Sequence, residues 1–486
     1  MSSGRKILIV ASEYYGLVKS GGLADAVASL TKYLNTMGHE TLIVVPYYAH
    51  MIPGVSSLAI PSLAVEMPMG TVRCAVRRQE VNGLAVHLIE HHQFFSRPGL
   101  YDYFGREYDD NPVRFSFFAM AALALCDELD FTPDIAHCHD WQTGMLPLYL
   151  SWRKAQGHGR FSKTKSLLTV HNGIFQGKFS AYHRGFLGLN NDSYPWNPYE
   201  DFGCINILKG GVHYADWVNT VSPNYATELQ TPAGGHGLHL AFLSKDGRFS
   251  GIINGIDTNL WNPETDPYIK KNYSADDRSG KRNCTLDLLK SMGLKLIKGA
   301  PVVGLVSRLT SQKGFDYLIS ALYMLMYENI QFVILGEGEK HFVDQLNRLQ
   351  HLNPTKVVFY HGYNEALAHK IEAGSHLFLM PSLFEPCGLN QLFSMRYGTL
   401  PIVRSVGGLK DSVKNFDYDI NGESTGFVFD EPTPAAVCGT LQWAADTYRN
   451  RTGHFSKMVT RAMKADFSIE KSGRDYEILY TKIINL

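Results

Sequence analysis

Short apolar segments that alternate with helical segments constrain the fold of this chain more than any other feature of its sequence. In the first half, the apolar segments lie at residues 6–11, 41–45, 135–137, 166–170 and 217–221. The pattern starts again with apolar segments at residues 301–306, 331–335, 357–360, 377–380, 401–403 and 426–429. Apolar strands joined by helices are typical of a mostly parallel sheet that is covered on both faces. The sequence therefore predicts an α/β protein with two Rossmann-like, doubly wound domains.

The two halves meet at a polar segment, residues 254–299, and we expect the interdomain linker there. This places an N-terminal domain at residues 1–255 and a C-terminal domain at residues 256–468. Within the first half, alternating residues on either side of Asn82-Gly83 predict a β-hairpin. Ligands of open α/β sheets bind at the carboxyl ends of the strands. We therefore expect the two domains to face a deep cleft, with site residues from both.

Composition excludes several classes of protein. Lys plus Arg and Asp plus Glu are equal, at 46 each in 486 residues, which argues against a protein that binds nucleic acid or an anionic membrane. The longest apolar stretch, residues 115–126, is shorter than the roughly 20 residues that span a bilayer. The cysteines form no CxxC pair, and their odd number and wide spacing indicate reduced thiols. We therefore expect a cytoplasmic protein, and the sequence leaves its oligomeric state open.

A glycine-rich turn follows the first strand, in the segment Lys19-Ser20-Gly21-Gly22-Leu23-Ala24-Asp25. Gly21 and Gly22 allow backbone N–H groups at a helix start to approach an anion, and Lys19 adds a positive charge. A tight turn with a surface lysine is the alternative interpretation. The fingerprint GxGxxG is absent, and the second strand ends in Val45-Pro46 without an acidic residue, which disfavours a dehydrogenase.

Arg308 and Lys313 lie on the loop that follows the first strand of the second domain. A guanidinium and an ammonium group on one loop suit a diphosphate, which needs positive charge at different oxygens. A solvated basic loop is the alternative, but the carboxyl end of a strand favours a ligand site.

A third group is the segment Glu385-Pro386-Cys387-Gly388-Leu389, just before a helix. A carboxylate here can accept hydrogen bonds from two sugar hydroxyls, while a glutamate stabilised by the helix dipole is the alternative. Cys387 has no histidine near it in sequence to activate it, so burial is the simpler interpretation. A glycine pair, Gly407-Gly408, follows another strand and is a further candidate for amides that face an anion or a sugar.

Histidines follow two strands of the first domain, in His137-Cys138-His139-Asp140-Trp141 and His171-Asn172-Gly173. A His-x-His pair with an aspartate could form a metal site, but no HxxxH or carboxylate series completes it. The alternative is that a histidine binds a sugar, with Asp140 as a hydroxyl acceptor or as the orienter of a neighbouring ring. We favour the second interpretation and expect neither a metal ion nor a cofactor.

Taken together, these segments closely resemble the bacterial glycogen synthase and plant starch synthase family, over nearly the whole chain. The order of the motifs makes the resemblance specific. The motifs are Lys19 to Asp25, His139-Asp140-Trp141, Thr169-Val170-His171-Asn172, Asn254-Gly255-Ile256-Asp257, Ser307-Arg308-Leu309 with Lys313-Gly314, Glu385 to Leu389, Tyr397-Gly398-Thr399-Leu400-Pro401 and Gly407-Gly408-Leu409.

The resemblance implies the GT-B glycosyltransferase fold, with a last helix, residues 469–484, that crosses back to the first domain. It implies transfer of glucose from ADP-glucose, or from UDP-glucose, to the non-reducing end of glycogen or another α-1,4-glucan, with retention of configuration. The first domain would face the glucan acceptor, and the second would bind the nucleotide-sugar donor.

The family motifs also imply roles for single residues. Lys19, Arg308 and Lys313 would contact the diphosphate, Glu385 would hold the sugar hydroxyls, and His171 would lie beside the anomeric carbon. Tyr363 matches a family position near the adenine ring. Further substrate contacts are implied for Gly21, Gly22, Asp25, Asp140, Asn172, Asn254, Cys387, Gly388, Leu389, Gly407 and Gly408.

Three departures and two alternatives qualify this interpretation. Ser20 replaces the Thr or Val that the family usually has, which is a mild change. Leu383 stands where the family commonly has Arg, and Phe393 stands where transferases outside the family often carry a ribose-binding glutamate, so we expect ribose recognition elsewhere. A non-catalytic glucan-binding protein of the same fold is one alternative, although it would be expected to have lost Arg308, Lys313 or Glu385. A glucan phosphorylase is the other, and it would need a pyridoxal-bearing lysine that we cannot identify.

Overall fold

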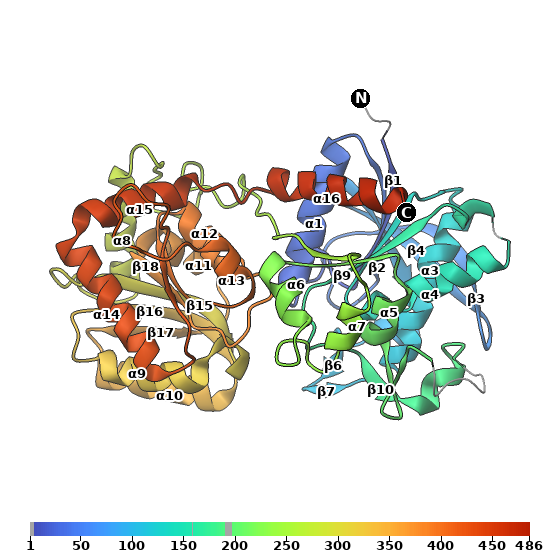
Figure 1. Ribbon diagram of the computed structural model, residues 1–486, viewed down its shortest axis with the longest axis horizontal. Helices are drawn as coiled ribbons and strands as arrows, with labels where there is room; N and C mark the ends of the chain where they lie inside the picture. Colours follow the sequence, from blue (N-terminus) through green and yellow to red (C-terminus); the bar gives the residue numbers. More distant parts are fainter. Residues whose placement is uncertain (1–3, 158, 190–196) are drawn as a thin grey trace. The chain divides into compact units, whose positions relative to one another are not determined.

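The computed structural model describes residues 4–157, 159–189 and 197–486, which divide into two compact units (Figure 1). Unit 1 contains the described residues up to Gly255 together with Ile469–Leu486, and unit 2 is Ile256–Ser468. The chain therefore leaves unit 1 once, after Gly255, and returns to it with its last helix.

Unit 1 is built on a nine-stranded sheet with the strand order β14-β13-β9-β8-β1-β2-β5-β4-β3. The neighbours from β14 to β5 are parallel, and β4 and β3 extend the sheet in antiparallel pairing. The strands are β1 (Lys6–Val10), β2 (Glu40–Pro46), β3 (Ser57–Met67), β4 (Gly70–Val81), β5 (Leu84–Glu90), β8 (Ile135–His139), β9 (Lys165–Val170), β13 (Trp217–Thr220) and β14 (Phe249–Gly251). The predicted hairpin is confirmed, because Val81 pairs with Leu84, and Asn82 and Gly83 both have the positive φ of a type I′ turn.

Helices cover both faces of this sheet because its central strands are apolar on both sides. In β1, Ile7 and Ile9 belong to one buried cluster, while Leu8 and Val10 belong to the other. The larger helices are α1 (Gly22–Thr36), α3 (Asn111–Glu128), α4 (Leu146–Ala155), α5 (Ile207–Tyr214), α6 (Pro223–Leu229), α7 (His239–Leu243) and α16 (Ile469–Ile484). Smaller elements of this unit are α2 (His92–Phe95), β6 (Asp102–Tyr103), β7 (Arg106–Glu107), β10 (Lys178–Ser180), β11 (Glu200–Asp201) and β12 (Cys204–Asn206).

The last helix, α16, packs beside α1 on one face of the unit 1 sheet (Figure 1). Gly473 lets the ring of Tyr33 approach the helix backbone, since a Cβ at this position would collide with that ring. The hydroxyl of Tyr33 donates to Glu477 at 2.9 Å, and Arg5 donates to the hydroxyl of Thr481 at 2.6 Å. These contacts fix the end of the chain to its beginning.

Unit 2 is built on a six-stranded sheet that is parallel throughout, with the order β17-β16-β15-β18-β19-β20. The strands are β15 (Val302–Leu309), β16 (Gln331–Gly338), β17 (Val357–His361), β18 (Leu377–Met380), β19 (Leu400–Arg404) and β20 (Phe427–Phe429). The helices are α8 (Ser279–Ser291), α9 (Phe315–Leu325), α10 (Lys340–Leu352), α11 (Glu365–Gly374), α12 (Asn390–Arg396), α13 (Gly407–Ser412), α14 (Pro434–Asn450) and α15 (Thr452–Lys464).

The strand order reverses at one point in each sheet. The chain winds outward from β15 through β16 to β17, then returns to the other side of β15 with β18. In unit 1 the corresponding reversal lies between β1 and β8. Loops that follow the two strands at such a switch point diverge and leave a crevice, where ligands of doubly wound folds bind.

The prediction of a linker over residues 254–299 is wrong for nearly all of its length. From Ile256 onward the segment belongs to unit 2, and it contains α8, whose Leu288 is fully buried against α11. The ring of Trp261 stacks between His369 and Phe393, at centroid distances of 3.9 and 3.8 Å. Some of its polar side chains, Asp266 among them, bond the interior of unit 2, so the segment is part of this folded unit and not a connection between the two units.

No helix within the described part of the chain is long and apolar enough to cross a membrane.

Candidate active site

The switch point of unit 2 brings together the loops that follow β15 and β18. The first loop contains a short 3-10 turn, Ser311–Lys313, and then Gly314, whose φ of 78° is left-handed. A Cβ at Gly314 would collide with the carbonyl oxygen of Pro381, which requires glycine here. The backbone N–H of Leu383 donates to the carbonyl of Gln312 at 2.8 Å, so the two loops are held edge to edge.

An ion pair between Lys313 and Glu385 lies at the centre of this loop pair. The Lys313 Nζ is 2.5 Å from the Glu385 Oε2, and the same oxygen accepts a hydrogen bond from the Ser382 hydroxyl at 2.8 Å. The two charged side chains are only 18% and 8% exposed. Burial weakens the screening of the pair by water, so the two groups hold each other in place.

Arg308 lies near the end of β15, the strand that leads into the Lys313 loop, and its side chain is in a different environment. Its side chain is exposed and makes no hydrogen bond or ion pair with any residue that the structure describes. A guanidinium group in this state can bind an incoming anion without first breaking an internal contact.

The predicted glycine pair supports the Glu385 loop. Gly407 has a φ of 42°, and a Cβ there would collide with the carbonyl oxygen of Glu385. The N–H of Gly408 donates to the carbonyls of Glu385 and Pro386, at 3.1 and 3.2 Å. In this structure the Gly408 amide therefore bonds the loop backbone, and the glycines serve the close approach of α13 to the loop.

The other predicted residues of this loop differ in accessibility. Cys387 is buried, and Gly388 has a left-handed φ of 70°. Leu389, at the start of α12, is half-buried. The carbonyl of Leu383, the residue that replaces the family's usual arginine, accepts a hydrogen bond from Arg404 at 2.5 Å.

Tyr363 lies after β17, and its side chain is 68% exposed. It lies two strands away from β15 in the sheet order, beyond β16. The structure therefore does not bring Tyr363 into the group formed by Lys313 and Glu385.

In unit 1, the turn between β1 and α1 holds a second charged pair. The Lys19 Nζ lies 2.7 Å from one carboxylate oxygen of Asp25 and 2.9 Å from the other. Burial raises the pKa of Asp25, and the charge of Lys19 opposes that shift. Gly21 precedes the first turn of α1, and a Cβ built on it would meet nothing within 4 Å, so space for a ligand remains beside it.

Glu13 is a residue of this turn that the sequence interpretation missed. Its carboxylate is 3% exposed and accepts hydrogen bonds from the backbone N–H of Ser20 at 2.5 Å and from its hydroxyl at 2.6 Å. The hydroxyl of Tyr101 also donates to it, at 2.6 Å. The available signal was an acidic residue directly after an apolar strand, which is a costly place for a carboxylate without partners.

Asp140 connects the ends of β8 and β9. It has an unusual φ of 57°, and its Oδ1 accepts hydrogen bonds from the backbone N–H groups of His171 at 2.6 Å and Asn172 at 3.4 Å. Burial raises the pKa of Asp140 to about 7 against the effect of these bonds. Its Oδ2 makes no hydrogen bond with any described residue and is the free acceptor of this carboxyl group. Asn172 uses its own side-chain oxygen to accept from the N–H of Ile174 at 3.2 Å.

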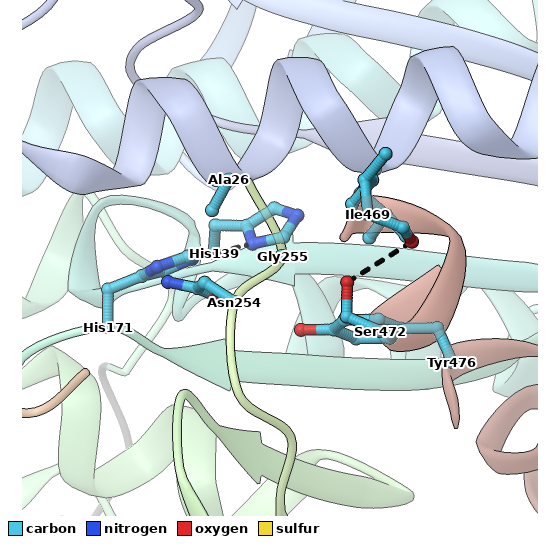
Figure 2. Close-up of a pocket in the computed structure, with 9 residues that line it drawn as sticks. Ala26, His139, His171, Asn254, Gly255, Ile469, Ser472 and Tyr476 are labelled. Atoms are coloured by element: carbon cyan, nitrogen blue, oxygen red, sulfur yellow. Dashed lines mark hydrogen bonds between the residues drawn. The ribbon is translucent and has the colours of Figure 1, made fainter. Parts of the chain in front are cut away.

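Two buried histidines face each other at the same strand ends (Figure 2). The Nδ1 of His139 is 3.1 Å from the Nε2 of His171. Burial lowers the pKa of His171 to about 3 and the pKa of His139 well below its usual range, so both rings are neutral near pH 7.

A small cavity lies beside this pair, and Asn254 and His171 both line it (Figure 2). Its volume of about 10 Å³ is the space of roughly one water molecule. Ala26 of α1 lines the same cavity, and so do Ser472 and Tyr476 of α16. The structure thus brings the helix that begins at the glycine turn, the histidine pair and Asn254 to one place in unit 1.

Both units of the chain match families of known proteins. Residues 6–243 match the starch synthase catalytic domain family, and residues 292–453 match glycosyl transferases group 1. A glycogen synthase of Photobacterium profundum is 42% identical over 481 residues, which cover 98% of this chain and 94% of that protein. Glycogen synthase 1 of Geobacter metallireducens is 40% identical and covers 99% of this chain and 96% of its own length.

The chain belongs to the glycogen and starch synthase family. The resemblance predicted from the sequence motifs is therefore confirmed, and so are the glycosyltransferase activity and the GT-B fold class. Members of this family transfer a sugar from a nucleotide-sugar donor to a glucan acceptor, so these are the two substrate classes of this enzyme.

Solved structures agree with this assignment. The catalytic domain of starch synthase IV from Arabidopsis thaliana, bound to ADP and acarbose, has a TM-score of 0.90, is 34% identical, and covers the full length of both chains. Sucrose-phosphate synthase from Thermosynechococcus elongatus has a TM-score of 0.61 at 16% identity over 99% of each chain, which shows the shared fold alone.

Proposed function

We propose that this enzyme transfers glucose from ADP-glucose to the non-reducing end of an α-1,4-glucan, such as glycogen, with retention of the anomeric configuration. The choice of ADP over UDP is supported by the Arabidopsis relative, whose structure contains ADP. The choice of an α-1,4-glucan is supported by the glycogen synthases that align over nearly the whole chain.

The observation that carries the proposal is the ion pair of Lys313 with Glu385 at the switch point of unit 2, together with Arg308 on the preceding strand, whose side chain has no partner among the described residues. We assign the main contacts of the donor to this crevice in unit 2, and the main contacts of the glucan acceptor to unit 1. Two cations on one strand end match a diphosphate, and a carboxylate beside them matches sugar hydroxyls.

The proposed chemistry breaks the bond between the glucosyl anomeric carbon and the phosphate oxygen. Negative charge then builds up on the departing ADP, and the sugar gains oxocarbenium character. Lys313 and Arg308 stabilise the leaving phosphate, which is the charge that develops most strongly in the transition state. The acceptor hydroxyl attacks from the face that ADP leaves, and its proton passes to the leaving phosphate oxygen.

Glu385 is assigned to binding rather than to nucleophilic attack. Its Oε2 is already engaged by Lys313 and by the hydroxyl of Ser382. A carboxylate stabilised in this way is a weak nucleophile, but its remaining lone pairs can accept hydrogen bonds from sugar hydroxyls. Cys387, Gly388 and Leu389 complete the same loop and are proposed to shape the sugar subsite.

In unit 1 we assign Lys19 and the Gly21-Gly22 turn to the diphosphate, with Asp25 as the carboxylate that holds Lys19. We assign Asp140 to a sugar hydroxyl, because its Oδ2 makes no hydrogen bond with any described residue and can accept one from the substrate. Further proposed contacts of the glucosyl group are His171, Asn172 and Asn254. Outside unit 1, we propose Gly407 and Gly408 as supports of the Glu385 loop and Tyr363 as a contact of the adenine ring.

One assay tests the proposal against its alternatives. The protein is incubated with radiolabelled ADP-glucose or UDP-glucose, with and without glycogen, and label in precipitated glucan is counted. We expect transfer from ADP-glucose that depends on glycogen. Transfer from UDP-glucose alone would overturn the nucleotide assignment, absence of transfer from both would favour a glucan-binding protein, and phosphate-dependent release of glucose 1-phosphate would favour a phosphorylase.

A further inference from the structure

The histidine pair of unit 1 contains a buried nitrogen without a partner. His139 is 1% exposed, and while its Nδ1 meets His171, its Nε2 is buried and has no hydrogen-bond partner among the described residues. In the His171 ring, the nitrogen without a described partner is accessible and not buried. Its Nε2 meets His139, and its Nδ1 makes no described hydrogen bond and is not buried. One nitrogen of the pair is therefore enclosed, and one is open to a ligand.

The enclosed nitrogen decides which ring donates. A neutral imidazole has one N–H and one lone pair, so the pair has two possible arrangements. If His171 donated, His139 would carry its own proton on the enclosed Nε2, which has no acceptor among the described residues, and burying an N–H without an acceptor is costly. If His139 donates from Nδ1, the enclosed atom is a lone pair, and in native proteins an acceptor without its full set of partners is more common than a buried N–H without one. The geometry therefore favours donation from His139 to His171.

A third histidine ring, that of His137, packs against the His139 ring. The His137 ring lies 4.1 Å from the His139 ring, and it is fixed by hydrogen bonds to the Thr169 hydroxyl at 2.7 Å and the Tyr480 hydroxyl at 2.9 Å. Tyr480 belongs to α16, so the returning helix contributes to the support. Asp140, which follows His139 in the sequence, bonds the backbone N–H of His171 and does not contact the rings through a described hydrogen bond.

We propose that His139 is a positioning residue that fixes His171 as the Nδ1–H tautomer, so that His171 presents a hydrogen-bond donor to an oxygen atom of the nucleotide sugar. This inference rests on the proposed place of His171 in the glucosyl subsite. It assigns His171 a neutral N–H donor and no part in proton transfer, in keeping with a ring that burial keeps uncharged near pH 7.

Two substitutions at the same position test the inference. His139→Leu fills the space but cannot donate, whereas His139→Asn places an amide nitrogen where Nδ1 was. We expect His139→Leu to lower kcat at least about tenfold with little change in KM for ADP-glucose, and His139→Asn to recover most of that loss. As a control, His376→Leu removes a half-buried histidine that bonds Val302 and Tyr448 at the amino end of the unit 2 strands, and it should leave kcat of the folded enzyme unchanged.

A purely structural role would give a different pattern, in which both His139 variants lose thermal stability and kcat together. Equal kcat for His139→Leu and the parent would overturn the inference, and so would failure of His139→Asn to recover activity at unchanged thermal stability. His171→Ala separates this from the proposed function. If it retains parental kcat, both the place of His171 and the role of His139 fail; if it loses activity while His139→Leu does not, only the present inference fails.

A measurement on the parent protein keeps the inference testable if His139→Leu does not fold. Long-range ¹⁵N–¹H spectra of histidine-labelled protein distinguish protonated from unprotonated ring nitrogens, and the His171 signals are assigned by their loss in His171→Ala. We expect a protonated Nδ1 and an unprotonated Nε2 in His171. A protonated Nε2 would contradict the proposed tautomer.

Discussion

Replacing Lys313 by methionine should lower stability and activity for two separate reasons, and a second substitution can separate them. Methionine keeps most of the aliphatic length but leaves Glu385, whose side chain is 8% exposed, without its cation. Removing one partner of a buried ion pair costs about 3–5 kcal/mol. The hydroxyl of Ser382 still donates to Glu385, and the Lys313 side chain is 18% exposed, so we expect a loss near the lower end, about 3 kcal/mol.

This loss is large enough to measure by thermal unfolding. For a domain the size of unit 2, about 3 kcal/mol corresponds to a decrease in Tm of roughly 6–12 °C. In the double variant Lys313→Met/Glu385→Gln, no unpaired charge remains, and the amide oxygen of the new glutamine side chain can still accept from Ser382. The double variant should therefore regain most of the lost stability.

Activity should behave differently. Loss of one preorganised donor to a developing anion lowers kcat by about 10²–10³, and the double variant restores no positive charge. We therefore expect both variants to be slow in the ADP-glucose transfer assay at a temperature where both are folded. A Lys313→Met enzyme with kcat within about threefold of the parent would refute the assigned role, whatever its stability.

Further predictions concern stability, pH and the ring stack. Asp140→Asn should stabilise unit 1 relative to the parent as pH rises, because the folded-state pKa of Asp140, about 7, lies above its usual 3.8 and ionisation therefore opposes folding of the parent. The gain in free energy of unfolding should be absent below about pH 4 and reach at most about 4 kcal/mol above pH 7. Urea unfolding across that pH range measures it. The same variant should transfer glucose more slowly if the free Oδ2 accepts a sugar hydroxyl, and an unchanged rate would remove that contact. Trp261→Ala should destabilise unit 2 by about 3 kcal/mol because it empties the space between His369 and Phe393, and unchanged thermal unfolding would show that the stack contributes nothing.

The alternation of apolar strands and helices was sufficient to predict the central strands of both sheets. Strands such as β1 and β15 are buried on both faces, which makes them continuous apolar runs in the sequence. Strand β3 was missed because it lies at the edge of the sheet, is largely exposed, and contains Pro61 where its pairing with β4 shifts register. Proline and exposure are signals that argue against a strand at sequence level.

The residues of the candidate site could be predicted more readily than their partners. Lys313 and Glu385 were singled out because each follows a strand, but their ion pair joins residues 72 positions apart and depends on β15 lying beside β18. Sequence motifs do not contain that neighbour relation. For the same reason Glu13 was missed, since its partners Ser20 and Tyr101 lie on segments whose approach the sequence does not specify.

The polar segment after Gly255 shows why composition misled the linker prediction. Its Asp266 accepts hydrogen bonds from His369 at 2.7 Å and from Tyr397 at 2.6 Å, in a site where the aspartate is buried. Phe393, which stands where related transferases often carry a glutamate, stacks its ring on Trp261. Polar residues that bond the interior cannot be distinguished from solvated ones by composition alone.

The most direct test of the central claim is the turnover of an Arg308→Gln variant. Arg308 is exposed and has no described side-chain partner, so its replacement should leave thermal stability unchanged, and any effect on activity reports on the donor alone. If this guanidinium stabilises the departing ADP, kcat with ADP-glucose and glycogen should fall by about 10² or more while Tm stays the same. Parental kcat in the folded variant would contradict the account.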